Sequence, residues 1–473
     1  MKQGCYFVSF LAAVCITLAI AVPGAYSKPS SADIEALYRA DEVFANEQDL
    51  VGFGPRVAGG PAEKAAADYI AAQMWSYGLD VEIQEFEIFY FEELSHPLLE
   101  QISPKPMNYA EGVDFATMSY SGSGDVTANV QAVDLLMPPT GGSTSGCEVA
   151  DFSGFTPGNI ALIQRGTCTF ALKAQNAEAA GAVGVIIFNE GNTPDRSGLL
   201  FGTLSGPGVT IPVVGTTFAL GEQLYNLMLQ GNVQVRMIVE AISELRTSQN
   251  VIGTLTGIQQ PSQGIVYIGG HYDSVSVSDG ANDDASGVAA VIEAARVLST
   301  KGHRTKATLK FIAFGAEETG LDGSYNYVDT NYDEVSTKGI GMINLDMIAV
   351  GDILQIGNIG YSDGGGSQLM DYTQQKATAM GMAWEQFTAD ENSDHTYFEQ
   401  AGVPSVFLTQ KPDPYYHTAK DTLDKIQVVT LEANGELATA VMYDWAKNPA
   451  LRAKKAAKFE KVHVYHDKVH HAE

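Results

Sequence analysis

The residues best suited to chemistry lie in one segment, residues 269–287, which reads GGHYDSVSVSDGANDDASG. An apolar run precedes the segment and a helical pattern follows it, so we expect a polar loop between a strand and a helix. An imidazole and several carboxylates on one loop can hold a divalent cation such as zinc. A solvated acidic loop has the same composition, so this segment alone leaves both interpretations open. The residues concerned are His271, Asp273, Asp279, Asp283 and Asp284.

Three later segments carry further candidate groups. FIAFGAEETG (residues 311–320) ends an apolar run with Glu317 and Glu318. Adjacent side chains of an extended segment point in opposite directions, so one glutamate can bind a metal while the other faces a reacting centre. GMINLDM (341–347) places Asp346 at the end of an apolar strand, a costly position for an unpaired carboxylate. PYYHTAKDTL (414–423) places His417 after two tyrosines in a loop.

The elements that position these groups alternate between strand and helix. The pattern predicts strands at 265–270, 308–314, 341–346, 353–356 and 404–408, and helices at 286–298, 368–380 and 430–445. A helix at 61–77 and a strand at 80–88 precede them. Such alternation is typical of an α/β fold with a mostly parallel central sheet and helices on both faces.

The candidate groups fall at one edge of that sheet. His271, the Glu317–Glu318 pair and Asp346 each come at or just after the end of a predicted strand. Parallel α/β sheets bind their ligands at the carboxyl ends of the strands. The sequence therefore predicts a shared metal site at that edge.

Residues 112–236 differ from the rest of the chain. Gly, Ser and Thr dominate residues 119–146, and short strand patterns recur up to about residue 214. We expect a small β-rich domain here, inserted between residues 28–111 and 237–450, which together form the α/β domain. No part of the insert collects candidate metal ligands.

The two ends of the chain carry their own patterns. Residues 1–27 contain a lysine near the start, an apolar run and small residues before a cleavage position, as secretory signal peptides do. We therefore expect a secreted or periplasmic protein, with an uncleaved anchor helix as the alternative. Residues 451–473 form a basic tail containing lysines and four histidines, and we expect an exposed end there.

Composition and charge exclude several classes of protein. Of the 473 residues, 45% are apolar and 18% are charged, so the chain can bury a core. The net charge of −28 argues against nucleic acid or an anionic membrane as a partner, and we expect no stable membrane association after signal cleavage. After removal of the signal, Cys147 and Cys168 remain. In an exported protein such a pair favours a disulfide over a metal site, with two buried thiols as the alternative.

The motifs HYDS, GANDDASG, EETG, NLDM and YHTAKDT resemble, in this order, those of the M28 family of zinc aminopeptidases, which use two zinc ions. The resemblance covers residues 33–110 and 245–447. It implies one zinc ion held by His271 and Asp346, a second held by Glu318 and His417, and Asp283 as a bridge between them. It further implies that Glu317 is the general base, that Asp273 orients His271 and that Tyr416 stabilises an oxyanion.

The insert carries a second resemblance. Residues 159–190, NIALIQRGTCTFALKAQNAEAAGAVGVIIFNE, are similar to the protease-associated (PA) domain. In that case Cys147 and Cys168 form an internal disulfide of the domain. The resemblance implies a role in substrate access or protein contacts and no role in the chemistry.

These resemblances predict an exported aminopeptidase that removes N-terminal residues from peptides or proteins. A zinc-bound hydroxide would attack, with Glu317 as the base. A carboxypeptidase of the same fold stays open, because Lys411, Lys420 and Lys425 lie near His417 in the sequence. A one-zinc glutaminyl cyclase and a receptor-like binding protein without activity stay open as well.

Overall fold

The computed structural model describes residues 1, 30–259, 264–300, 303–360 and 368–448. The predicted signal peptide, apart from its first residue, and the predicted basic tail both lie outside this part of the chain. Within it, no helix combines the length and the apolar character that crossing a membrane requires.

Two sheets organise the described residues. The first has the strand order β1 (Asp80–Glu93), β10 (Ala241–Leu255), β12 (Thr308–Phe314), β11 (Ile265–His271), β13 (Gly339–Leu345), β16 (Ser405–Lys411), β14 (Ile353–Asn358) and β15 (Trp384–Thr388). The second has the order β3 (Met107–Asn108), β2 (Leu98–Ser103), β9 (Gln234–Val239), β5 (Gly124–Ala132), β6 (Ile160–Gln164), β7 (Gly184–Phe188), β8 (Val213–Thr216) and β4 (Phe115–Thr117).

Helices accompany both sheets. Those around the first sheet are α1 (Ser31–Glu35), α2 (Ala40–Val51), α3 (Pro61–Ser76), α6 (Ser286–Ser299), α7 (Asp322–Thr330), α8 (Tyr332–Lys338), α9 (Gln368–Ala379), α10 (His395–Gln400) and α11 (Val428–Lys447). The second sheet carries α4 (Phe170–Ala179) and α5 (Phe218–Met228). Short turns of helix also occur, namely η1 (Val149–Phe152), η2 (Pro194–Arg196), η3 (Ala281–Ala285) and η4 (Leu423–Lys425).

The centre of the first sheet is parallel. Strands β12, β11, β13 and β16 are neighbours in that order, and each pairs with the next in parallel. β1, β10 and β14 are the antiparallel additions at the two sides. The carboxyl ends of four adjacent strands therefore meet at one edge, as the sequence predicted.

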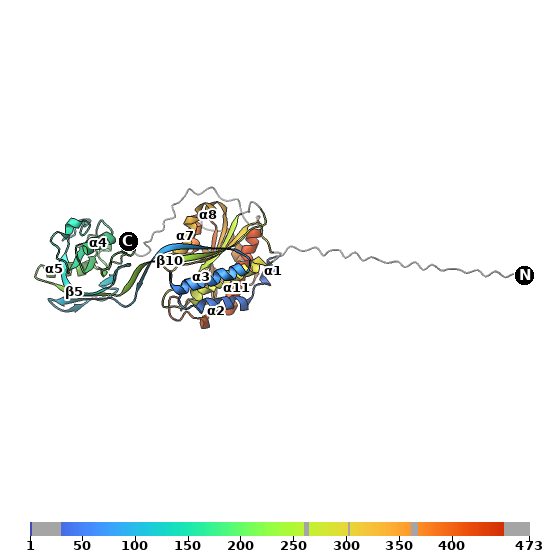
Figure 1. The fold of residues 1–473 in the computed structure, drawn as a ribbon, viewed down its shortest axis with the longest axis horizontal. Helices are drawn as coiled ribbons and strands as arrows, with labels where there is room; N and C mark the ends of the chain where they lie inside the picture. Colours follow the sequence, from blue (N-terminus) through green and yellow to red (C-terminus); the bar gives the residue numbers. More distant parts are fainter. Residues whose placement is uncertain (2–29, 260–263, 301–302, 361–367, 449–473) are drawn as a thin grey trace.

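Side chains point alternately to the two faces of the sheet, so each of these strands contributes to two cores. Val266 and Ile268 face one core, whereas Tyr267, between them, faces the other. Successive side chains of a strand point to opposite faces, which is why this continuously apolar strand needs a cover on both. Figure 1 shows α2, α3 and α11 on one face of the sheet and α7 and α8 on the other. The mixed α/β fold with helices on both faces is confirmed.

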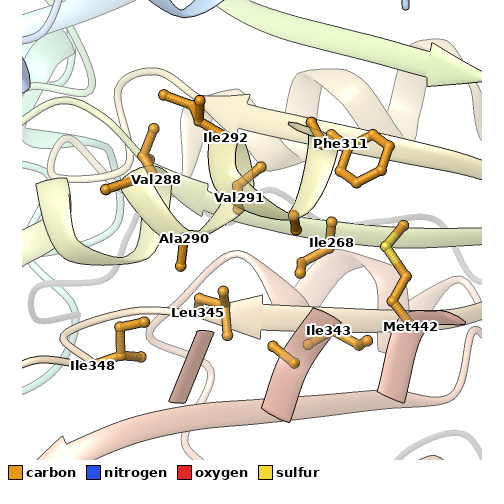
Figure 2. Close-up of a cluster of buried hydrophobic side chains, with 14 of the residues drawn as sticks. Ile268, Val288, Ala290, Val291, Ile292, Phe311, Ile343, Leu345, Ile348 and Met442 are labelled. Carbon is orange, nitrogen blue, oxygen red and sulfur yellow. The ribbon is translucent and has the colours of Figure 1, made fainter. Parts of the chain in front are cut away.

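Helix α6 fills the middle of the larger core. Its sequence, SGVAAVIEAARVLS, is apolar almost all round, as expected of a helix that lies inside a protein. Figure 2 shows Val288, Val291 and Ile292 of this helix among Ile268, Phe311 and Ile343 of the strands. Because packing in the core holds α6 in place, it also holds η3, the turn that leads into the helix.

Strands β1 and β10 form a long antiparallel ribbon that connects the two parts of the molecule. Asp80 pairs with Thr254 at one end, and Glu93 pairs with Ala241 at the other. In Figure 1 the ribbon leaves the first sheet and runs toward the smaller part of the molecule, where β5, α4 and α5 are labelled. A disulfide joins Cys147 and Cys168 in this second part, with the two Cα atoms 5.8 Å apart.

Individual elements agree with the sequence to different degrees. The strand predicted at 308–314 is β12, and the helix predicted at 61–77 is α3, one residue shorter. The strand predicted at 80–88 extends to Glu93. Strand β10 and helices α5, α7, α8 and α10 had no counterpart in the prediction.

Candidate functional site

The predicted site residues come together at the edge formed by the four parallel strands. His271 is the last residue of β11, and Asp346 directly follows β13. Glu317 and Glu318 lie in the turn after β12, and His417 lies in the loop after β16. Asp283 lies in η3, the turn that leads into α6. The sheet thus delivers side chains from five distant parts of the sequence to one place.

Asp283 lies between the two histidines. Its Oδ1 is 3.2 Å from Nε2 of His271, and its Oδ2 is 3.2 Å from Nε2 of His417. On the outer sides, Asp346 Oδ1 is 3.8 Å from Nε2 of His271, and Glu318 Oε2 is 3.0 Å from Nε2 of His417. The arrangement is a row of two His–carboxylate pairs that share the central carboxylate.

Two further groups contact the His271–Asp346 side of this row. Nδ1 of His271 is 3.5 Å from Oδ1 of Asp273, so the carboxylate lies on the side of the ring away from Asp283. The hydroxyl of Ser393 donates to Oδ2 of Asp346 at 2.7 Å and accepts from the amide of Asn344. Ser393 was not predicted as a site residue, because it carries no recognisable sequence motif of its own.

The Glu317–Glu318 pair lies in a turn and not in the extended segment that we predicted. The two backbone N–H groups donate to the two oxygens of Asp273, at 3.0 and 3.1 Å. Asp273 therefore contacts His271 and also fixes the turn that carries both glutamates. The correction has a physical reason: Ala316 has a φ of 55°, which ends the strand and starts the turn.

Left-handed residues recur next to the candidate ligands. Ala316, Met347 and His417 have φ angles of 55°, 62° and 53°. Such a conformation costs a non-glycine residue roughly 1–3 kcal/mol, and residues of this kind cluster at functional sites. Each of the three turns the chain sharply where a strand or loop presents a site residue.

Asp284 is a further carboxylate near the row. It forms a possible metal-binding group with His271 and Asp346. One oxygen of each carboxylate and one ring nitrogen of His271 lie within 4.8 Å of one another. However, Oδ1 of Asp284 already accepts from the N–H groups of Gly287 at 2.8 Å and Met347 at 3.1 Å. A Cβ on Gly287 would lie 2.5 Å from this carboxylate, so the glycine makes room for it. We therefore regard Asp284 as a residue that holds the turn before α6 in place.

Burial and mutual proximity shift the ionisation of the row. Burial raises the pKa of Glu318 to about 7, and the neighbouring Asp283 adds to the shift. Burial alone would lower the pKa of His417, but the carboxylates of Asp283 and Glu318 outweigh it and raise that pKa to about 10. Burial and the carboxylates of Glu318 and Asp346 together raise the pKa of Glu317 well above its usual value. The carboxylates of the cluster would therefore stabilise a positive charge placed between them.

The donor set fits a pair of zinc ions. Zinc binds histidine nitrogen and carboxylate oxygen, and both types alternate along the row. Buried oxygens of Asp283, Glu318 and Asp346 have no hydrogen-bond partner among the described residues. Buried polar atoms without partners are costly, and a cation between them would satisfy all three.

The row lines a pocket of about 300 Å³. Met347, Phe387 and Phe407 provide apolar walls, and Phe387 and Phe407 pack edge to face with ring centres 5.6 Å apart. Tyr416 lies at the rim, half exposed, with its ring stacked on His417 at 3.8 Å between centres. The pocket is large enough for one amino-acid side chain beside the row.

Both the sequence and the fold resemble those of known proteins. The model of peptidase family M28 matches residues 250–442, and that of the PA domain matches residues 126–224. Aminopeptidase YwaD of Bacillus subtilis is 33% identical over 88% of this chain and 87% of its own length. An aminopeptidase of Pseudomonas aeruginosa PAO1 is 39% identical over 66% of this chain, which spans 57% of that relative's length.

Two solved structures agree with this result. The aminopeptidase from Aneurinibacillus sp. strain AM-1 has a TM-score of 0.65 and 33% identity, over 90% of this chain and 98% of that chain. BSAP, a zinc aminopeptidase from Bacillus subtilis, has a TM-score of 0.58 and 32% identity, over 89% and 98%.

Proposed function

Because the chain belongs to peptidase family M28, we propose that it is an exported aminopeptidase that works with two zinc ions. The observation that carries the proposal is the position of Asp283, with one oxygen 3.2 Å from each of two histidines. His271 and Asp346 would hold one ion, and Glu318 and His417 the other, with Asp283 shared. The zinc aminopeptidase BSAP, 32% identical, supports the choice of metal.

The proposed mechanism divides the work among residues of the pocket. When bound, zinc polarises a carbonyl and lowers the pKa of a water molecule. Glu317 accepts the proton of the attacking water and returns it to the leaving amine. Its raised pKa, caused by burial and nearby carboxylates, suits a group that must hold a proton for part of the cycle. Tyr416 at the rim would donate to the developing oxyanion.

The same proposal covers the rest of the chain. We propose that residues 112–236 act as a PA domain and that residues 1–27 direct export. Strands β2 and β3 precede residue 112 but belong to the same second sheet, so we propose that they are part of this domain as well. The acidic pocket suits the cationic amino terminus of a peptide, so we propose peptide or protein N-termini as substrates.

One observation favours a second candidate, a carboxypeptidase. Of the three lysines near His417 in the sequence, Lys411 lines the pocket, and its Nζ lies 5.7 Å from the ring centre of Tyr416. A terminal carboxylate could pair with that ammonium group. Lys425 instead pairs with Asp424, outside the pocket.

Matched peptides separate the two candidates. A pentapeptide with a free amino terminus, its N-acetylated form and its C-amidated form are incubated with the protein, and the products are identified by mass spectrometry. An aminopeptidase shortens the free and the amidated peptides from the amino end and leaves the acetylated one intact. Release of C-terminal residues from the acetylated peptide would show a carboxypeptidase and overturn the proposal.

A further inference from the structure

The loop between β11 and α6, residues 272–283, is held by two charged side chains from remote parts of the sequence. The first is Arg56, which is fully buried. Its Nε donates to the carbonyl of Tyr272 at 2.6 Å, and its two terminal nitrogens donate to the carbonyls of Asp279 and Gly280 at 2.7 and 2.8 Å. The planar fork of one guanidinium thus joins both ends of the loop.

The backbone around Arg56 strengthens this contact. Its N–H donates to the hydroxyl of Ser274 at 3.0 Å, and its carbonyl accepts from the N–H of Ser274 at 3.2 Å. The segment before α3 therefore pairs with the loop much as a short strand would. Among the described contacts, the guanidinium donates to backbone carbonyls and makes no ion pair with a carboxylate.

The second charged side chain is Asp421, only 1% exposed. Its Oδ1 accepts from the N–H of Asn282 at 2.7 Å, and its Oδ2 accepts from the N–H of Asp283 at 3.1 Å. Both oxygens of Asp421 therefore bind backbone N–H groups. One belongs to Asp283, which lies between the two histidines, and the other belongs to the preceding residue, Asn282. Asp421 belongs to the YHTAKDT motif, but the sequence alone predicted no role for it.

The two contacts are complementary in charge. A cation binds the carbonyls on one side of the loop, and an anion binds the N–H groups at its end, so each backbone group meets the charge that suits it. Burying either ion without partners would cost several kcal/mol, which these hydrogen bonds offset. The negative charges of Asp273 and Asp421 also stabilise the buried Arg56 guanidinium.

We infer that Arg56 and Asp421 are positioning residues that hold the loop 272–283 from its carbonyl side and its N–H side, and so fix the Asp283 carboxylate between His271 and His417. The inference rests on the proposed function, because Asp283 matters most as a shared zinc ligand. Neither residue is among those that line the pocket, so neither is catalytic.

The test uses two conservative variants, each with a matched control. Asp421→Asn keeps the shape but leaves one oxygen in place of two, so it cannot accept from both N–H groups. Its control is Asp424→Asn, three residues on, where the carboxylate is exposed. Arg56→Lys keeps the charge but cannot reach three carbonyls with one ammonium group. Its control is Arg246→Lys, where the guanidinium donates to the carbonyl of Ala58 and stacks on Tyr90.

Three quantities are measured on the full-length protein: zinc affinity by competition with a chelator, the visible spectrum after replacement of zinc by Co²⁺, and kcat and KM. Loss of a residue that orients a metal ligand typically weakens metal affinity about 10–100-fold. We expect a loss of this size in both variants, an altered cobalt spectrum, and a fall in kcat with KM changed less than about twofold. The controls should match the wild type in all three.

A merely structural role would lower the melting temperature and leave zinc affinity and the cobalt spectrum of the folded protein unchanged, and that result would overturn the inference. If Arg56→Lys does not fold, Ser274→Ala replaces it, because this change removes a contact of Arg56 and keeps the guanidinium. If Asp421→Asn does not fold, Asp421→Glu replaces it, because this change keeps both oxygens but displaces them from the two N–H groups. Failure of the proposed function looks different: the wild type itself would then bind no zinc or release no N-terminal residue.

Discussion

Glu317 and Glu318 have the same side chain and adjacent positions, yet their surroundings differ. Glu318 is 3.0 Å from His417 and next to Asp283, within the row of candidate ligands. Glu317 lines the same pocket but is not among the carboxylates that pair with either histidine in the described structure. Asp273 binds the N–H groups of both and so fixes how the two side chains diverge.

This difference predicts opposite outcomes for two substitutions. Glu317→Gln removes the proposed base and keeps the shape, so kcat should fall about 10²–10⁴-fold with zinc content unchanged. Glu318→Ala removes a proposed ligand, so the protein should lose one zinc ion. Zinc content and steady-state kinetics are measured on both variants. The assignment is wrong if Glu317→Gln keeps a near-normal kcat or is the variant that loses zinc.

The residue types at the site were visible in the sequence, but their exact placement was not. His271, Asp283, Glu318, Asp346 and His417 could be selected because each stands beside a strand or in a polar loop. By contrast, nothing about alanine or methionine indicates a left-handed backbone at Ala316 and Met347. The roles of Arg56 and Asp421 were hidden for another reason: their partners are backbone atoms more than 130 positions away.

Elements were predictable where burial leaves a pattern. The strand β12 lies between two cores, so its seven residues form an almost continuous apolar run. The first half of β10 lies in the ribbon between the two sheets and is largely polar, ISELRTSQ, so it carries no strand signal. Helix α7, DGSYNYVDT, is short and polar and was missed for the same reason.

Helix α2 contains a buried carboxyl group that should make stability depend on pH. Glu47 is fully buried, and neither of its oxygens has a hydrogen-bond partner among the described residues. Burial, with help from the charge of Asp421, raises its pKa well above the usual value. The folded protein therefore keeps a proton that the unfolded chain releases near pH ~4.3, so folding stability falls as pH rises above that value.

Glu47→Gln removes this dependence because glutamine does not ionise. Relative to the wild type, the variant should become steadily more stable as pH rises above about 5, by at most about 1.4 kcal/mol per pH unit. Urea midpoints at several pH values across this range measure the trend. Glu42→Gln, on the accessible side of the same helix, is the control for the loss of one acidic side chain. A difference between Glu47→Gln and wild type that stays constant with pH would contradict the expectation.

At the largest scale, the fold brings negative charge from several distant parts of the chain together in one place. Five carboxylates line one pocket of a protein with a net charge of −28, namely those of Asp283, Glu317, Glu318, Asp346 and Asp390. Carboxylates this close together repel one another, whereas two bound divalent cations would attract all of them. Chelation should therefore lower both the activity and the melting temperature, and added zinc should restore both.

The number of zinc ions in the active protein tests the account most directly. Purified protein that releases N-terminal residues is freed of loosely bound metal, and its zinc and protein contents are determined by elemental analysis. We predict two zinc ions per chain, because Asp283 has one oxygen for each of two separate sets of ligands. Fully active protein with one zinc ion per chain, or with none, would contradict the account.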